Sequence, residues 1–92
     1  MVLIVKNRSR NDRFSDILES ARGRGVIKTR ITEEASISFD QLKEYLSVLI
    51  ERNLLELIPD QALYRTTDKG LKYLNAYHKM HELAGDLRQI SV

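Results

Sequence analysis

The sequence predicts an α+β fold that is mostly α-helical, in which a β-hairpin follows a group of helices and a long helix ends the chain. Two observations lead to this prediction. Apolar residues recur at helical spacing in several segments, whereas two short apolar runs flank a turn that contains Pro59. The 92 residues are 42% hydrophobic and 30% charged, which is the balance of one small globular domain.

The first predicted helix begins at Asn11 or Asp12, either of which can cap it, and runs to about Arg22. Its apolar residues have i, i+3, i+4, i+7 spacing: Phe14, Ile17, Leu18 and Ala21. Gly23 and Gly25 follow directly and end the helix.

A brief extended segment and a second helix come next. Residues 26–28 are short and apolar at their start, which favours an extended conformation. Residues 29–35 predict a compact helix with Thr29 as its cap, and residues 36–37 predict a tight break after it.

The third helix carries the clearest signal. Ser38 and Gln41 fit a capping box, in which each side chain satisfies a free backbone N–H of the other residue. One apolar stripe follows at helical spacing: Leu42, Tyr45, Leu46, Leu49 and Ile50. Asn53 tolerates a left-handed conformation and is expected to end the helix.

A hairpin and a last helix complete the chain. Residues 54–58 and 63–67 are strand-like runs about the Pro59 turn. Thr67 or Asp68 can cap a final helix that extends to Ile90.

This order of elements is the winged helix-turn-helix arrangement, because a short break separates the second and third helices and a hairpin follows them. The predicted organisation is a basic N-terminal arm (residues 1–10), a winged helix-turn-helix domain (residues 11–67) and a C-terminal helix (residues 68–92).

Linked segments of the sequence also resemble a known family. VIKTRITEEASISFDQLKEYLSVLIERNLLELI, followed by YRTTDKGLKYLNAY, is similar to small archaeal winged helix-turn-helix DNA-binding proteins, which include coiled-coil-dimerised chromatin-type proteins and predicted transcriptional regulators. The resemblance covers roughly residues 8–84. It implies that the third helix enters the DNA major groove, that the hairpin follows the backbone or minor groove, and that the last helix pairs with its copy.

Composition excludes several classes of protein. The absence of cysteine excludes a disulfide scaffold, a thiolate zinc site and a catalytic thiol. No apolar run approaches the roughly 18 residues of a membrane helix, and the run at residues 1–5 is too short for a signal-peptide core. We therefore expect a cytoplasmic protein that does not bind membranes, and the family resemblance implies that it is associated with the nucleoid.

The charge is unevenly distributed. Residues 1–30 carry a net charge of +5 and residues 31–92 carry −3, which together give the total of +2. A basic N-terminal third favours a polyanionic partner, although a solvated surface stretch explains the same charge equally well.

The candidate DNA-contacting residues come from four places in the sequence. They are Lys6, Arg8 and Arg10 on the arm, Lys28, Thr29 and Arg30 at the second helix, Ser38, Phe39, Asp40, Gln41 and Lys43 on the third helix, and Arg65 on the wing. Short polar side chains near a helix N-terminus suit base edges, and Phe39 suits a thymine methyl group or packing under the second helix. The alternatives are a solubilising arm, a solvated helix face and, for Arg65, a cross-strand pair with Glu56.

The last helix carries a heptad seam. Its members are Tyr73, Tyr77, Met80, Ala84 and Leu87. A long amphipathic helix on so small a domain needs a cover, so we expect an antiparallel coiled-coil homodimer; docking within the chain is the alternative.

Two histidines on this helix, His78 and His81, have a spacing at which metal binding is conceivable. No third strong ligand cluster accompanies them, so solvated or interface histidines are expected, with no metal or other cofactor. No catalytic motif is visible either. The sequence therefore predicts a non-enzymatic double-stranded DNA-binding protein, a transcriptional regulator or chromatin-type protein whose small-molecule effector the sequence leaves unknown. A winged-helix protein-interaction module is the alternative.

Overall fold

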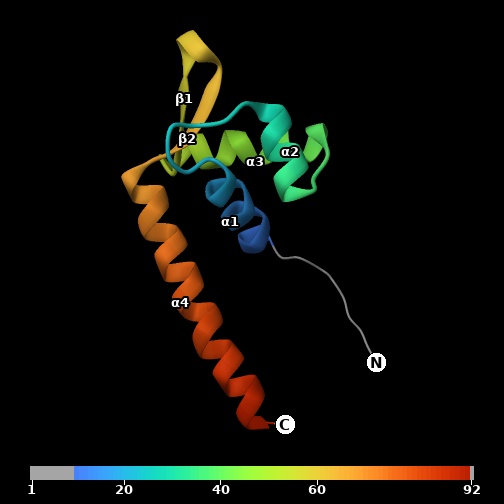
Figure 1. The fold of residues 1–92 in the computed structure, drawn as a ribbon, viewed down its shortest axis with the longest axis vertical. Coiled ribbons are helices and arrows are strands. Elements are labelled where there is room, and N and C mark those ends of the chain that lie inside the picture. The colour runs from blue at the N-terminus through green and yellow to red at the C-terminus, as the bar shows by residue number, and fades with distance from the viewer. Residues whose placement is uncertain (1–9, 92) are drawn as a thin grey trace.

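The computed structural model describes the backbone of residues 10–91 and the side chains of residues 10–83. Figure 1 shows the shorter helices gathered around the base of a hairpin, with the long last helix running away from them. The elements are α1 (Arg10–Ser20), α2 (Lys28–Ala35), α3 (Phe39–Glu51), β1 (Leu55–Ile58), a 3-10 turn (Pro59–Gln61), β2 (Leu63–Thr66) and α4 (Asp68–Ser91). The predicted order of elements and the mostly helical α+β class are confirmed.

The core lies where α1, α2 and α3 meet the base of the hairpin. The most deeply buried large side chains are those of Ile17, Leu18, Ile31, Leu42, Leu49 and Leu55. Phe14 of α1 meets Tyr45 of α3 edge to face at 5.5 Å between ring centroids, which fixes the two helices against each other. The predicted apolar faces of α1 and α3 are thus the core faces, except that Ile50 lies at the margin and is exposed.

The helix α1 begins at Arg10, so Asn11 and Asp12 lie inside it and the predicted cap at one of them is wrong. The start of α2 also differs from the prediction. The residue before the helix is Ile27, which makes no side-chain cap, so the assignment of Thr29 as the cap is wrong. The carbonyl of Ile27 accepts hydrogen bonds from the backbone N–H groups of Arg30 and Ile31, and this starts the helix at Lys28. The chain enters α2 from an extended segment held by the hairpin, and that tertiary contact fixes the boundary.

Local signals around α3 are confirmed. The side chain of Ser38 accepts a hydrogen bond of 3.2 Å from the backbone N–H of Gln41, as one half of a capping box requires. Ser36 and Asn53 take left-handed conformations (φ of 55° and 62°), one at the break before α3 and one at the turn after it.

The hairpin pairs β1 and β2 in antiparallel register, with Glu56 opposite Arg65 and Leu57 opposite Tyr64. Val26 forms an isolated antiparallel bridge to Tyr64 on the other edge of β2. The predicted extended segment is therefore reduced to one β-bridge, which joins the link between α1 and α2 to the wing.

The last helix begins with a side-chain cap, since the hydroxyl of Thr67 accepts a hydrogen bond of 3.0 Å from the backbone N–H of Gly70. Leu74 reaches into the core, and α4 packs against α1 before it leaves the domain (Figure 1). None of the helices in the described part of the chain is long and apolar enough to cross a membrane.

Candidate nucleic-acid interface

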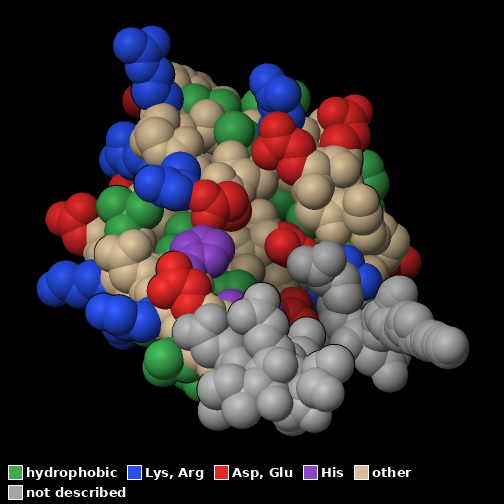
Figure 2. Space-filling view, turned by 60° about the horizontal axis from the view of Figure 1, so that its bottom comes forward, with side chains coloured by type: hydrophobic (Ala, Val, Ile, Leu, Met, Phe, Trp, Pro, Cys, Tyr) green, Lys and Arg blue, Asp and Glu red, His purple; other side chains and the backbone are tan. Residues whose placement is uncertain are grey.

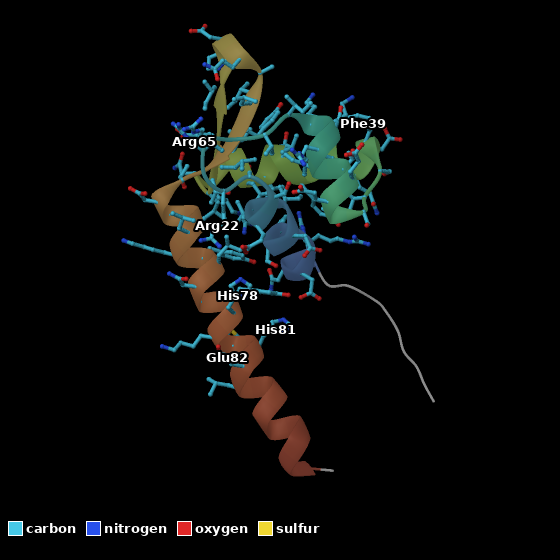
Figure 3. All side chains as sticks on the ribbon, in the orientation of Figure 1. Arg22, Phe39, Arg65, His78, His81 and Glu82 are labelled. Carbon is cyan, nitrogen blue, oxygen red and sulfur yellow. The ribbon has the colours of Figure 1, made fainter. Side chains whose placement is uncertain are left out.

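The outward face of α3 carries all five residues predicted there. Ser38, Phe39, Asp40, Gln41 and Lys43 are exposed around the first turns of the helix, while Leu42 and Leu46 face the core. The Phe39 side chain is 54% exposed and lies at the end of α3 remote from the hairpin (Figure 3). More than half of the Phe39 surface is therefore available for contact with DNA.

The start of α2 presents Lys28, Thr29 and Arg30 to solvent. Arg30 makes an ion pair of 3.4 Å with Glu34 one turn later, which leaves its charge partly compensated. Within residues 10–83, no carboxylate lies within 4 Å of the Lys28 ammonium group. In this part of the chain Lys28 is thus an uncompensated cation beside the backbone N–H groups of a helix start, a setting that suits an anion.

Arg65 on the wing forms the cross-strand pair that was one of its two predicted roles. Its guanidinium donates to Glu56 at 2.9 Å, and both side chains are about half exposed. Figure 3 shows Arg65 at the opposite end of α3 from Phe39. Contact with phosphate at this position would compete with an ion pair already made.

The predicted basic arm is described only at its last residue. Lys6 and Arg8 lie outside the described residues. Arg10 is the first residue of α1 and not part of an extended arm; its guanidinium lies 5.6 Å from the ring centroid of Phe14.

Comparison with known proteins now decides the family. A family model described as winged helix-turn-helix matches residues 7–85. The chain belongs to the winged helix-turn-helix family. The crystal structure of Sso10a-2, described as a DNA-binding protein from Sulfolobus solfataricus, is similar, with a TM-score of 0.78 at 21% identity over 91% of this chain and 90% of that one. No curated protein sequence matches. The resemblance to small archaeal winged helix-turn-helix proteins is confirmed for the fold.

In this winged helix-turn-helix protein, the residues of the predicted dimer seam lie in different environments. The Tyr73 hydroxyl donates to Asn11 at 3.3 Å and that of Tyr77 donates to Asp12, so both tyrosines bind α1 of their own chain. Met80 is 70% exposed, and the side chains of Ala84 and Leu87 lie outside the described residues. The alternative of docking within the chain therefore holds for the two tyrosines.

Electrostatics at this contact favour the neutral phenols. Burial, and after it the negative charge of Asp12, raises the pKa of Tyr73 above its usual value of 10.0. The pKa of Tyr77 is raised by burial first and then by its hydrogen bond to Asp12. Both hydroxyls therefore remain donors over the physiological pH range.

The two histidines extend the same contact. His78 lies 3.3 Å from a carboxylate oxygen of Glu19, and His81 lies 3.5 Å from one of Asp12. The His81 ring also lies on that of Tyr77, with 4.4 Å between ring centroids. Figure 2 shows these purple side chains among red carboxylates. Among residues 10–83, no group of three or more ligand side chains suits a metal ion.

Sequence analysis missed this acidic face of α1. Asp12, Asp16 and Glu19 have i, i+4, i+7 spacing and therefore share one side of the helix. On α4, Tyr77 and His81 are four residues apart and share one side of the helix, and His78 follows Tyr77 directly. Matching these two polar faces could have predicted the α1–α4 contact, but both have the pattern of solvated or intermolecular surfaces.

Proposed function

We propose that the chain binds double-stranded DNA through the exposed face of α3 and the start of α2, and that it acts as a transcriptional regulator or chromatin-type protein in the cytoplasm, associated with the nucleoid. The observation that carries this proposal is the exposed first turn of α3, which Ser38 caps and Phe39 begins. In helix-turn-helix domains the N-terminal residues of the second helix contact base edges in the major groove. The description of Sso10a-2 as a DNA-binding protein supports the same role.

Each exposed side chain has a suitable role in such a complex. The Ser38 hydroxyl and Gln41 amide can bond base edges, and Asp40 can accept from a cytosine amino group. Lys43 and Lys28 suit phosphate oxygens, which position the protein without reading sequence. Lys6 and Arg8 precede α1 and are proposed to contact the backbone or minor groove.

We also propose that two copies pair through α4 as an antiparallel coiled coil. Tyr73 and Tyr77 are occupied by α1, so the proposed interface shifts toward the part of α4 beyond them, where Met80 and Leu83 are exposed and Ala84 and Leu87 continue the seam. Two exposed α3 faces per dimer would need a separation near one DNA turn of about 34 Å or a multiple of it.

The test is duplex binding in a gel shift at two salt concentrations, with Lys28→Glu/Arg30→Glu as the variant. We expect weaker binding by the variant and, for four to six phosphate contacts, a loss of roughly two to three orders of magnitude in affinity for a fourfold rise in salt. Lys72→Glu/Lys79→Glu makes the same charge change on exposed α4 residues and serves as the matched control. Equal losses of duplex affinity in both variants would show that the start of α2 is not part of the DNA interface.

A specific observation favours a second candidate, a protein-interaction module. Asp40, Glu44 and Glu51 make the exposed side of α3 acidic beside Lys43, and acidic groups oppose phosphate. Absence of any duplex binding at low salt would favour this alternative.

A further inference from the structure

The wing has an apolar face that extends past the core. Leu55 and Thr66 are paired at the base of the hairpin, and both are buried. The next pair on the same face is Leu57 with Tyr64, since side chains alternate along a strand. Tyr64 is buried, but Leu57 is 45% exposed, so the outer half of this face lacks a cover in the described part of the chain.

A second wall stands opposite Leu57. Ile27, at the start of α2, is 51% exposed and lines the same groove, as do Pro59 and Ala62 of the wing turn. The groove has a volume of about 480 Å³. Sites for small molecules span about 300–1,000 Å³ and are mostly apolar with a few polar groups, so both the size and the lining fit such a site.

The two walls are held in place by backbone hydrogen bonds. Val26 donates to Tyr64 at 2.9 Å and accepts from it at 2.8 Å, which ties the segment before α2 to the wing. Gly25 has a φ of +105°, and a Cβ at this position would approach the Tyr64 carbonyl oxygen to 3.1 Å. A glycine thus permits the close approach that forms the groove, and the groove exists before any ligand binds.

The charge of the groove selects the ligand. Among the described residues, Lys28 is the only charged one that lines it, and Thr29 adds a hydroxyl beside it. Apolar walls with one cation suit a compact apolar molecule that ends in a single negative group, whereas a polyanion would find one partner and a cation would be repelled. We propose that this groove binds a small aromatic or aliphatic carboxylate, with its apolar body between Ile27 and Leu57 and its carboxylate on Lys28.

Such a ligand has a consequence for DNA binding, which rests on the proposed function. Lys28 is assigned there to phosphate, and a carboxylate on Lys28 neutralises that charge. The ligand and the duplex therefore compete for one side chain, and the ligand lowers duplex affinity.

The test measures the binding of indole-3-acetate to the whole chain without DNA, by ¹H–¹⁵N NMR titration. We expect saturable shifts at the amides of residues 27–29, 57 and 62, with a dissociation constant of about 1 mM or lower for a molecule of this size. Tryptamine, which carries the same ring and a positive group, should bind at least about tenfold more weakly, because its charge opposes Lys28.

Matched variants separate the groove from general surface binding. Leu57→Asn and Lys28→Gln should each weaken indole-3-acetate binding about fivefold or more, the first by removing apolar area and the second by removing charge. Leu71→Asn and Lys79→Gln change exposed residues outside the groove and should bind like the parent. Equal binding of both probes, or no saturable shift at residues 27–29 and 57, would overturn the proposal. Shifts at the amides of residues 27–29 and 57 that depend on protein concentration in the absence of indole-3-acetate would overturn it as well, because they would assign the groove to a second copy. Because DNA is absent, the result does not depend on the proposed function.

Discussion

The Tyr77 hydroxyl on α4 donates a hydrogen bond to the carboxylate of Asp12 on α1, two residues that are 65 positions apart in the sequence. Tyr73 and Asn11 make a parallel contact one turn away, and His78 and His81 approach carboxylates of the same α1 face. The first half of α4 is therefore part of the domain, joined to α1 by polar contacts around the buried Leu74.

This bond predicts a measurable decrease in stability. Tyr77→Phe should lower the free energy of unfolding by about 1 kcal/mol, because it removes a hydrogen bond to a carboxylate at a half-buried site. Urea unfolding of Tyr77→Phe, Asp12→Ala and the double variant measures the coupling energy between the two side chains. The cycle subtracts the contribution that the other contacts of Asp12 make to stability. Tyr73→Phe, whose bond is 3.3 Å and exposed, should cost less. A coupling near zero between Tyr77 and Asp12 would contradict the assignment.

Acid should weaken the fold in part through Glu19. A hydrogen bond from Arg22 is the largest cause that lowers the pKa of Glu19 below its usual value of 4.5, and one from His78 adds to it, against the opposing effect of burial. A carboxylate whose pKa is lower when folded stabilises the protein above pH 4.5, and this contribution is lost as the pH falls through the folded value. Glu19→Gln should therefore flatten the loss of stability below pH 4.5, by less than about 1 kcal/mol because the pair is exposed.

The matched control for this pH series is Glu33→Gln. Glu33 is also an exposed glutamate, and it makes no ion pair within the described part of the chain. Thermal unfolding from pH 7 to pH 3 should give the parent pH profile for this variant. Identical profiles for Glu19→Gln and the parent would show that the Arg22 contact contributes nothing.

Gly70 is predicted to be intolerant of any side chain. A Cβ at Gly70 would fall inside van der Waals distance of the Leu54 carbonyl oxygen and 2.6 Å from Cγ2 of Thr66. Gly70→Ala should thus destabilise by about 1–3 kcal/mol through overpacking, although alanine is the better helix former. Asn75→Ala, at an exposed site on the same helix, should be neutral or slightly stabilising. Chemical denaturation compares the two, and equal stabilities would contradict the predicted clash.

The exposed ring of Phe39 leads us to predict a preference for thymine over uracil in the duplex. If its ring contacts thymine methyl groups in the major groove, replacing every dT by dU in one sequence should weaken binding about fourfold for each methyl group that the ring touches. Phe39→Ala should bind both duplexes equally, at the weaker level. Fluorescence anisotropy measures all four combinations. A dT preference that survives in Phe39→Ala would assign the methyl interaction to another residue.

The part of α4 beyond the tyrosines predicts the oligomeric state. Met80 and Leu83 are 70% and 61% exposed, so aspartate at both positions should leave the domain folded and shift a dimer to monomers. Asn75→Asp/Lys79→Asp places two aspartates at other exposed positions of α4 and should remain dimeric. Sedimentation equilibrium distinguishes the two variants. An unchanged oligomer in Met80→Asp/Leu83→Asp would place the interface elsewhere.

The parts of the fold that local chemistry fixes were predictable from the sequence. Ser38 needs only the helix behind it to act as a cap, and Asn53 and the Pro59 turn need only their own backbone preferences. The order of elements followed from these signals. The same holds for the outward face of α3, since the apolar stripe leaves Phe39 and Lys43 outside.

The sequence was least informative where distant segments meet. The start of α2 is set by Ile27, whose position depends on the bridge between Val26 and Tyr64. Tyr73 and Tyr77 have the spacing of an intermolecular seam, and nothing local shows that α1 reaches them first. Arg65 could equally be a phosphate ligand or a strand partner by alternation, and only the register of β1 and β2 places it opposite Glu56.

The length of α4 determines how the contact with α1 affects the position of the far end of the helix. Its 24 residues extend about 36 Å, while the tyrosine and histidine contacts with α1 all lie within its first four turns. About ten residues of α4, or about 15 Å, extend past His81, so a tilt of a few degrees at these contacts would displace the far end of the helix by about 1 Å. The side chains of α4 that face α1 therefore set the direction in which the rest of the helix leaves the domain.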